Sequence, residues 1–216
     1  MKNNLYIFFS SILAGMCIAI GVTVYLSTMP YNKVLGTFLF ALGLFTIMHF
    51  GLHLFTGKIG LTLDHKPSYL ITMVFCLLGN IVGAFVLASI IKLTRINPTL
   101  VESAQYLVNS KMNDTWYSIF ILSFMCGILI YIAYKGHTIC PYDMGKVIFA
   151  FLAIVIFILC SYEHCVANVA YFTFAGVFNL KVVGYFLLMV LGNSVGAILL
   201  DGALKVNNIL KNRADE

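Results

Sequence analysis

Six long runs of apolar residues alternate with shorter polar stretches along this chain. The runs cover residues 5–26, 34–55, 69–91, 116–134, 147–178 and 182–204. Each run can cross a bilayer, because a transmembrane helix needs about 20 predominantly apolar residues. The pattern therefore predicts an all-α membrane protein with six transmembrane helices and with both termini on the same side of the membrane.

Polar residues interrupt the second and the fifth of these runs. Residues 53–58 read His-Leu-Phe-Thr-Gly-Lys, and residues 162–168 read Tyr-Glu-His-Cys-Val-Ala-Asn. Irregular backbone at membrane depth is tolerated only where protein buries it or where it lines a water-filled space. We therefore expect helices two and five to be broken beside a polar path.

Three short motifs occur in both halves of the chain, in the same order and at nearly the same spacing. Pro-Tyr-Asn at 30–32 is matched by Pro-Tyr-Asp at 141–143, and His53 is matched by His164, each pair 111 residues apart. Gly-Asn-Ile-Val-Gly-Ala at 79–84 is matched by Gly-Asn-Ser-Val-Gly-Ala at 192–197, 113 residues later. Each half has three runs, an odd number, so the second half is expected to be inverted in the membrane. Inverted repeats place the substrate path at their interface.

These matches predict one transmembrane domain, residues 1–216, made of two repeats. Repeat one covers about 5–92, a polar connection covers 93–114, repeat two covers about 115–204, and a cytoplasmic tail covers 205–216. Glycines at the small-x-x-x-small spacing of the Gly-Asn motifs allow helix backbones to approach closely. Asn80 and Asn193 need partners inside the membrane, and we expect them to hydrogen bond to the backbone of a broken helix.

Composition excludes several classes of protein. The chain is 61% hydrophobic and 10% charged, whereas soluble domains carry about 25% charged residues, so lipid must be the solvent. The net charge of +5 comes from scattered residues, and no basic cluster predicts nucleic-acid binding. Most of the six cysteines lie in apolar runs without a C-x-x-C pair, so no disulfide framework is expected. There is no phosphate-loop motif for nucleotide hydrolysis.

The distribution of Lys and Arg predicts the orientation. With both termini in the cytoplasm, eight of these residues lie inside and five outside, as the positive-inside rule favours. The first run is too long for a signal peptide and no cleavage site follows it. We expect a multi-pass protein of the inner (plasma) membrane.

His164 is the strongest candidate for a functional residue. Ionisable residues inside a membrane are rare and usually functional, and histidine can exchange a proton near pH 6.5. The alternative is a neutral histidine that only bonds to the backbone. Thr56 offers a hydroxyl that can face His164 across a pore, and Glu163 is expected to anchor the loop.

The motifs together resemble the formate/nitrite transporter family over nearly the whole chain. The resemblance rests on Gly43-Leu44-Phe45 leading to Leu54-Phe55-Thr56, on the two Gly-Asn-x-x-Gly segments, and on Glu163-His164-x-x-Ala167-Asn168. It implies an aquaporin-like fold, a homopentamer with a pore in each protomer, and passage of formate, nitrite, hydrosulfide or lactate, in many members together with a proton. The sequence departs from the family pattern at Gly57-Lys58 and at His53, where members usually have an acidic or other polar residue.

The resemblance also implies roles for individual residues. The central histidine matches His164 and its neighbouring threonine matches Thr56. The apolar constrictions match Phe40, Leu44, Phe55 and Phe157, and we add Lys58 as a cation that gathers the anion at the pore mouth. The supporting residues are Glu163, Asn168, Asn80, Asn193 and His53.

The residues lead to a transport hypothesis with two alternatives. Lys58 attracts the anion, His164 or its bound water supplies a proton, and the neutral acid crosses the constrictions, with a proton, a small anion and lipid as partners. No cofactor and no enzymatic activity are expected. One alternative is a haem- or metal-binding subunit that uses His49, His53 and His164, although no third ligand is evident near the first two. The other is a pore for neutral solutes.

Overall fold

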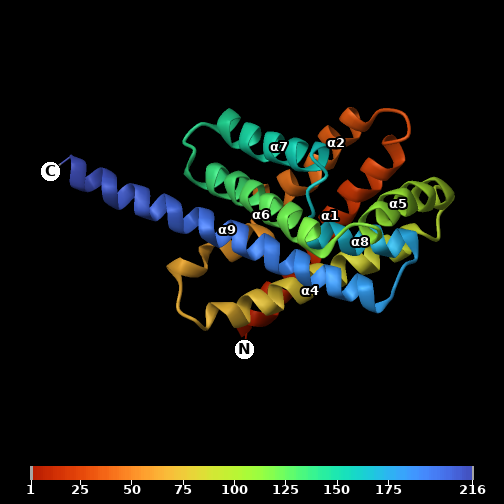
Figure 1. Cartoon of the computed structure of the whole chain (residues 1–216), viewed down its shortest axis with the longest axis horizontal. Coiled ribbons are helices and arrows are strands. Elements are labelled where there is room, and N and C mark those ends of the chain that lie inside the picture. The colour runs from red at the N-terminus through yellow and green to blue at the C-terminus, as the bar shows by residue number, and fades with distance from the viewer. Residues whose placement is uncertain (1, 216) are drawn as a thin grey trace.

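The apolar runs form helices close to the places that the pattern predicts. The computed structural model describes residues 2–215, which contain helices and no strands (Figure 1). The elements are α1 (Lys2–Thr28), α2 (Lys33–His49), α3 (Phe55–Lys58), the short 3₁₀ helix η1 (Ile59–Asp64), α4 (Tyr69–Ile91), α5 (Asn97–Met112), α6 (Trp116–Ile139), α7 (Asp143–Leu159), α8 (Cys165–Ala175) and α9 (Leu180–Ala214).

Local capping residues set several of the helix starts. The Asn32 side chain accepts a hydrogen bond from the backbone N–H of Leu35 at 2.9 Å, which caps α2. Asn179 accepts from the N–H of Val182 at 3.0 Å and caps α9. Such caps satisfy backbone donors that the first helical turn leaves free. Gly176 follows the last residue of α8 and caps it with a φ of 70°, which glycine adopts without steric cost.

The second and fifth runs are broken helices, as predicted. Helix α2 ends at His49, and an extended segment leads to α3 at Phe55. Helix α7 ends at Leu159, and α8 begins at Cys165. In the part of the chain that the structure describes, four helices are long and apolar enough to cross a membrane by themselves, namely α1, α4, α6 and α9. In chain order, the broken pair α2–α3 lies between α1 and α4, and the broken pair α7–α8 lies between α6 and α9.

The two halves repeat the same packing contacts at equivalent glycines. Helix α1 packs on α4 in the first half, and α6 packs on α9 in the second. A Cβ on Gly83 would lie 2.0 Å from the carbonyl oxygen of Ile12, and a Cβ on Gly196 would lie 2.1 Å from that of Phe124. Glycine at these positions allows the backbones of each pair to touch, as in other membrane helix pairs.

Asparagine hydrogen bonds correct one detail of the predicted repeat. Asn80 donates to the carbonyl oxygen of His53, whereas Asn193 donates to that of Glu163. His53 is therefore equivalent to Glu163, and the predicted pairing of His53 with His164 was wrong by one residue. The residue equivalent to His164 is Leu54, since these two are the N-caps of α3 and α8.

The polar connection between the repeats contains a helix that the sequence analysis did not predict. Helix α5 lies against α8 (Figure 1). It buries one face, on which Leu100, Ala104 and Val108 follow each other at four-residue intervals. This spacing is the signature of an amphipathic helix. The predicted tail is also mostly helical, because α9 continues to Ala214.

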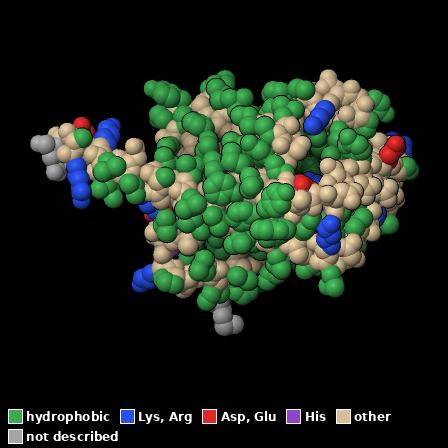
Figure 2. Space-filling model, in the orientation of Figure 1, with side chains coloured by type: hydrophobic (Ala, Val, Ile, Leu, Met, Phe, Trp, Pro, Cys, Tyr) green, Lys and Arg blue, Asp and Glu red, His purple; other side chains and the backbone are tan. Residues whose placement is uncertain are grey.

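The outer surface is largely apolar. Figure 2 shows hydrophobic side chains over most of the middle of the visible face, and most Lys and Arg side chains toward its edges. Large side chains such as Leu5, Val74 and Leu187 are more than half exposed. Soluble monomers rarely expose such continuous apolar surface. The surface fits a multi-pass membrane protein.

Candidate functional site

The break between α7 and α8 places His164 at the centre of the molecule. As the N-cap of α8, its ring Nδ1 lies 3.1 Å from the backbone nitrogen of Ala167 and accepts the N–H hydrogen bond. Its Nε2 lies 2.8 Å from the hydroxyl oxygen of Thr56, in the first turn of α3. His164 is 2% exposed and Thr56 is fully buried. The histidine and the threonine that sequence reasoning singled out are thus in direct contact across the two broken helices.

These hydrogen bonds determine the tautomer of His164. Because Nδ1 accepts from a backbone N–H, it carries no proton, and the neutral ring has its proton on Nε2. The ring therefore donates to the Thr56 oxygen, which leaves the hydroxyl hydrogen of Thr56 free to bond to another group. A second proton can join the ring only at Nδ1, with loss of the cap on α8.

Asn80 and Asn193 hold the two breaks in place. The Asn193 side chain accepts from the N–H of Cys165 at 2.9 Å and donates to the carbonyl oxygens of Ser123 and Glu163 at 2.7 and 2.8 Å. Asn80 makes the equivalent three bonds, to the N–H of Phe55 and to the carbonyls of Ser11 and His53. Each asparagine satisfies backbone groups that an interrupted membrane helix leaves without partners.

A charged network supports the loop on the α5 side. The ammonium of Lys111, at the end of α5, donates to the carboxylate of Glu163 at 2.7 Å and 2.5 Å. The Asn168 amide donates to the same carboxylate at 2.8 Å. Glu163 and Asn168 are 3% and 1% exposed. Burial of a carboxylate at this depth requires such compensation, since an unpaired buried charge is very costly.

Apolar side chains close the path next to His164. The Phe40 and Phe157 rings pack edge to face with centroids 6.0 Å apart. Together with Leu44 they surround a space beside His164 that is too narrow to admit a water molecule. Three isoleucines complete this constriction: Ile18, Ile130 and Ile154.

A cavity lies on each side of this constriction. The Lys58 cavity, of about 110 Å³, shares Leu44 with the constriction. The Lys111 cavity, of about 40 Å³, shares Phe157 and His164 with it. The order along the protein is therefore a cavity with a lysine, a dry apolar constriction beside His164, and a second cavity with a lysine.

Comparisons with known proteins agree with this architecture. A family model described as formate/nitrite transporter matches residues 2–206. The chain belongs to the formate/nitrite transporter family. Relatives include the formate channel FocA of Haemophilus influenzae, 29% identical over 77% of this chain and 65% of FocA, and the formate channel FocB of Escherichia coli K12, 26% identical over 81% and 68%. The chain spans about two thirds of the length of these relatives.

Two solved channel structures share the fold. A pentameric formate channel with formate bound superposes with a TM-score of 0.84 and 22% identity, over 97% of this chain and 98% of that channel. An FNT family ion channel superposes with a TM-score of 0.81 and 23% identity, over 96% and 91%. The formate/nitrite transporter fold that the motifs predicted is confirmed.

The structure of this family member brings most of the predicted site residues together, but not all of them. Phe40, Leu44 and Phe157 surround one constriction with His164. Phe55 is buried, yet it lines neither the constriction nor the two cavities. Its backbone N–H donates to the Asn80 side chain, and its carbonyl oxygen accepts from the N–H of Ile59.

The histidines of the metal alternative do not converge. His53 bonds to the Ser10 hydroxyl at 3.0 Å, and the His49 ring lies 6.3 Å from the ring of His137. His164 is occupied by Thr56 and Ala167. Within residues 2–215, no group of three His, Cys, Asp or Glu side chains is placed to hold a metal ion.

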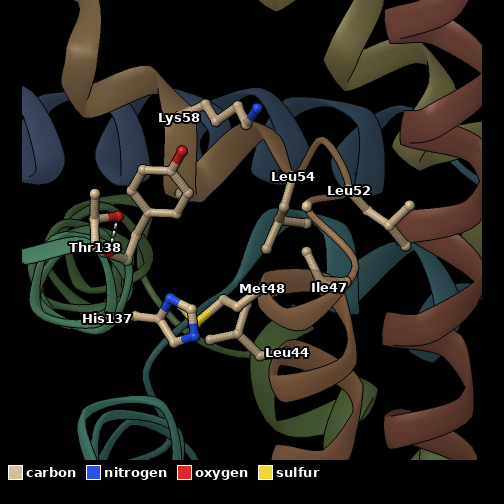
Figure 3. Close-up of a pocket in the computed structure, with 11 residues that line it drawn as sticks. Leu44, Ile47, Met48, Leu52, Leu54, Lys58, His137 and Thr138 are labelled. Atoms are coloured by element: carbon tan, nitrogen blue, oxygen red, sulfur yellow. Dashed lines mark hydrogen bonds between the residues drawn. The ribbon is translucent and has the colours of Figure 1, made fainter. Parts of the chain in front are cut away.

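Sequence reasoning missed the lining of the Lys58 cavity. Its polar side chains are Lys58, Tyr134, His137 and Thr138, and its other lining residues are apolar or glycine. Figure 3 shows His137 and Thr138 on one side, and Leu54 with Lys58 across the cavity from them. A signal for His137 was its place just after the fourth apolar run, beside Lys135.

Proposed function

We propose that the protein is a channel for small monovalent weak-acid anions, with formate, nitrite, hydrosulfide and lactate as the candidate substrates. The observation that carries the proposal is the buried hydrogen bond between Thr56 and His164 beside the dry constriction. Membership of the formate/nitrite transporter family and the two relatives named as formate channels support it.

The apolar constriction favours passage of the neutral acid over the bare anion. An anion between Phe40, Leu44 and Phe157 loses its hydration, which costs several kcal/mol or more. Protonating a carboxylate with a pKa near 3.7 at pH 7 costs about 4–5 kcal/mol, at about 1.36 kcal/mol per unit. The neutral acid then crosses without the dehydration cost of a charge, so a modest local bias makes this route the easier one.

The local bias toward the neutral acid comes from the apolar constriction, because desolvation disfavours the charged form of an acid. Hydrogen-bonding groups beside the constriction hold the anion before it is protonated. The free hydroxyl hydrogen of Thr56 can donate to an oxygen or sulfur of the substrate. The N-terminal end of α8, which carries partial positive charge, also faces this region through its cap His164. These groups stabilise an anion as it reaches the constriction, where it accepts a proton.

The geometry of His164 favours water as the proton source. Its Nδ1 already accepts from Ala167, so the ring holds one proton on Nε2 and directs it at Thr56. Transferring that proton to the substrate would leave the ring as an anion, which histidine does not form near neutral pH. Of the two donors considered from the sequence, water in the adjoining cavity therefore fits, and His164 serves to orient Thr56.

We further propose a homopentamer with both termini in the cytoplasm. The pentameric formate channel with the same fold supports the assembly, and the excess of Lys and Arg on one side supports the orientation. In this orientation the Lys58 cavity opens toward the cytoplasm and the Lys111 cavity toward the opposite side. Lipid contacts the exposed apolar side chains that no neighbouring protomer covers.

Stopped-flow uptake into proteoliposomes tests the proposal. Formate, nitrite, hydrosulfide and lactate are offered in turn, with a pH dye inside the vesicles. We expect rapid uptake of at least one of them with acidification of the vesicle interior, because the neutral acid that enters dissociates there and releases its proton. When the gradient is reversed, the neutral acid carries the proton out, and the dye signal must reverse sign. Uptake should speed up as external pH falls. A silent protein that passes neutral solutes would overturn the proposal.

A further inference from the structure

The Lys58 cavity contains basic and neutral polar groups but no acidic one. Lys58 comes from α3, and Tyr134, His137 and Thr138 come from α6. None of the described residues that line the cavity is Asp or Glu. Its volume of about 110 Å³ is several times that needed for one water molecule. The cavity therefore has room and the right charge for a small anion.

Lys58 differs in this respect from the lysine of the other cavity. Lys111 is neutralised by the Glu163 carboxylate at 2.5 Å. Among the ion pairs of residues 2–215, none involves Lys58, whose ammonium has no carboxylate within 4.0 Å. Of these two lysines, only Lys58 retains a charge available to a ligand.

His137 brings a second basic side chain to the same cavity. Its Nε2 is buried and has no hydrogen-bond partner among the described residues. Because this nitrogen has almost no accessible surface, His137 acts on an anion in the cavity through its charge rather than through a bond from Nε2. Figure 3 shows the His137 ring facing the cavity, with Lys58 farther along it.

The charged groups near His137 are basic, apart from the Asp143 carboxylate, which is paired with Lys146. His49 of α2 lies with its ring centroid 6.3 Å away, and Lys58 of α3 lines the same cavity. Lys146 of α7 interacts electrostatically with His137 but does not line the cavity. Its ammonium is paired with the Asp143 carboxylate at 2.9 Å. A proton on His137 therefore adds a positive charge that no lining carboxylate cancels.

We propose that Lys58 and His137 form an anion-binding site in this cavity, and that protonation of His137 tightens the site. The ligand is a small oxyanion of the formate or nitrite type, with an oxygen bonded to the lysine ammonium and with the charge of protonated His137 adding to the attraction. The identity of the ligand rests on the proposed function. The site concentrates the anion before the constriction and does so more strongly when the solution on its own side is acidic.

Binding of isotope-labelled formate to the purified protein tests the site without transport. Formate is titrated at constant ionic strength, and the broadening of its NMR signal is measured at each concentration. The titration is done at about pH 5 and at about pH 8, on either side of the usual histidine pKa of about 6.5. Wild type should bind more tightly at the lower pH. Lys58→Gln should weaken binding about tenfold or more, because it removes a charge-assisted hydrogen bond. Equal binding by this variant and wild type would overturn the site.

Histidine variants separate the switch from the lysine. His137→Gln should bind formate equally at both pH values, whereas His137→Arg, which keeps a permanent charge, should bind tightly at both. His65→Gln and Lys66→Gln are matched controls, because both residues are exposed and line neither cavity. An unchanged pH response in both His137 variants refutes the switch.

The two proposals fail in different ways. Transport by wild type together with normal formate binding by Lys58→Gln would reject the site and keep the channel. Binding that depends on Lys58 and His137, without transport of any of the four substrates, would keep the site and reject the channel.

Discussion

Replacing Thr56 by valine removes one oxygen from the centre of the proposed pore and keeps the shape of the side chain. The hydroxyl lies 2.8 Å from His164 Nε2, and both residues are buried. The variant leaves the Nε2 proton without a partner, which costs about 1–3 kcal/mol of folding free energy. Thr56→Ser keeps the oxygen, so it should recover most of this loss.

The same substitution should slow transport by a calculable factor. If the Thr56 hydroxyl bonds to the substrate at the barrier, its loss costs a hydrogen bond of about 0.5–1.5 kcal/mol, or about 1.5–3 kcal/mol if the substrate is still charged. At about 1.36 kcal/mol per tenfold, these ranges correspond to about 2- to 13-fold and about 13- to 160-fold slower transport. The size of the effect therefore reports the charge of the species at Thr56.

The assay combines stopped-flow uptake with thermal unfolding of the same preparations. Thr173→Val is the matched control, because Thr173 is also buried but its hydroxyl bonds to the Val169 carbonyl within α8 and lines neither cavity. It should transport like wild type. Uptake by Thr56→Val at the wild-type rate would refute the reasoning, as would a Thr56→Ser variant as slow as Thr56→Val.

Three further substitutions test the packing that supports the site, each by thermal unfolding in detergent. Gly196→Ala would bring a Cβ to 2.1 Å from a backbone carbonyl of α6 and should cost about 1–3 kcal/mol, whereas Gly184→Ala, with open space around it, should cost nothing. Asn193→Leu leaves three backbone groups without their partner and should lower stability by about 1–3 kcal/mol for each group that finds no other. Lys111→Met leaves the Glu163 carboxylate buried and unpaired, at a cost of about 3–5 kcal/mol. Adding Glu163→Gln should restore part of that loss, and no recovery would contradict the charge explanation.

Hydrophobic run length predicted the long helices well, for a physical reason. Inside lipid the backbone must satisfy its own hydrogen bonds, so an apolar run of sufficient length has no alternative to a helix. The run at 69–91 matches α4 at both ends. Helix α5 was missed because it is short and amphipathic, and its stability comes from packing on α8 rather than from lipid.

Repeated motifs predicted the breaks but not their register. Spacing alone pairs His53 with His164, whereas the Asn80 and Asn193 hydrogen bonds pair His53 with Glu163. The offset between the two halves varies by one to three residues from motif to motif. Only the contacts decide which residues are equivalent, because small shifts in loop length leave the sequence pattern almost unchanged.

The sequence by itself determined the membrane class, the broken helices and the central histidine, since these depend on composition and on residues close together in the chain. Tertiary structure decided which distant groups meet. It pairs Lys111 with Glu163, 52 residues away. It also places Lys58 in the same cavity as His137, with no carboxylate paired to the lysine. Charge compensation depends on distance in space, and the chain pattern carries no record of it.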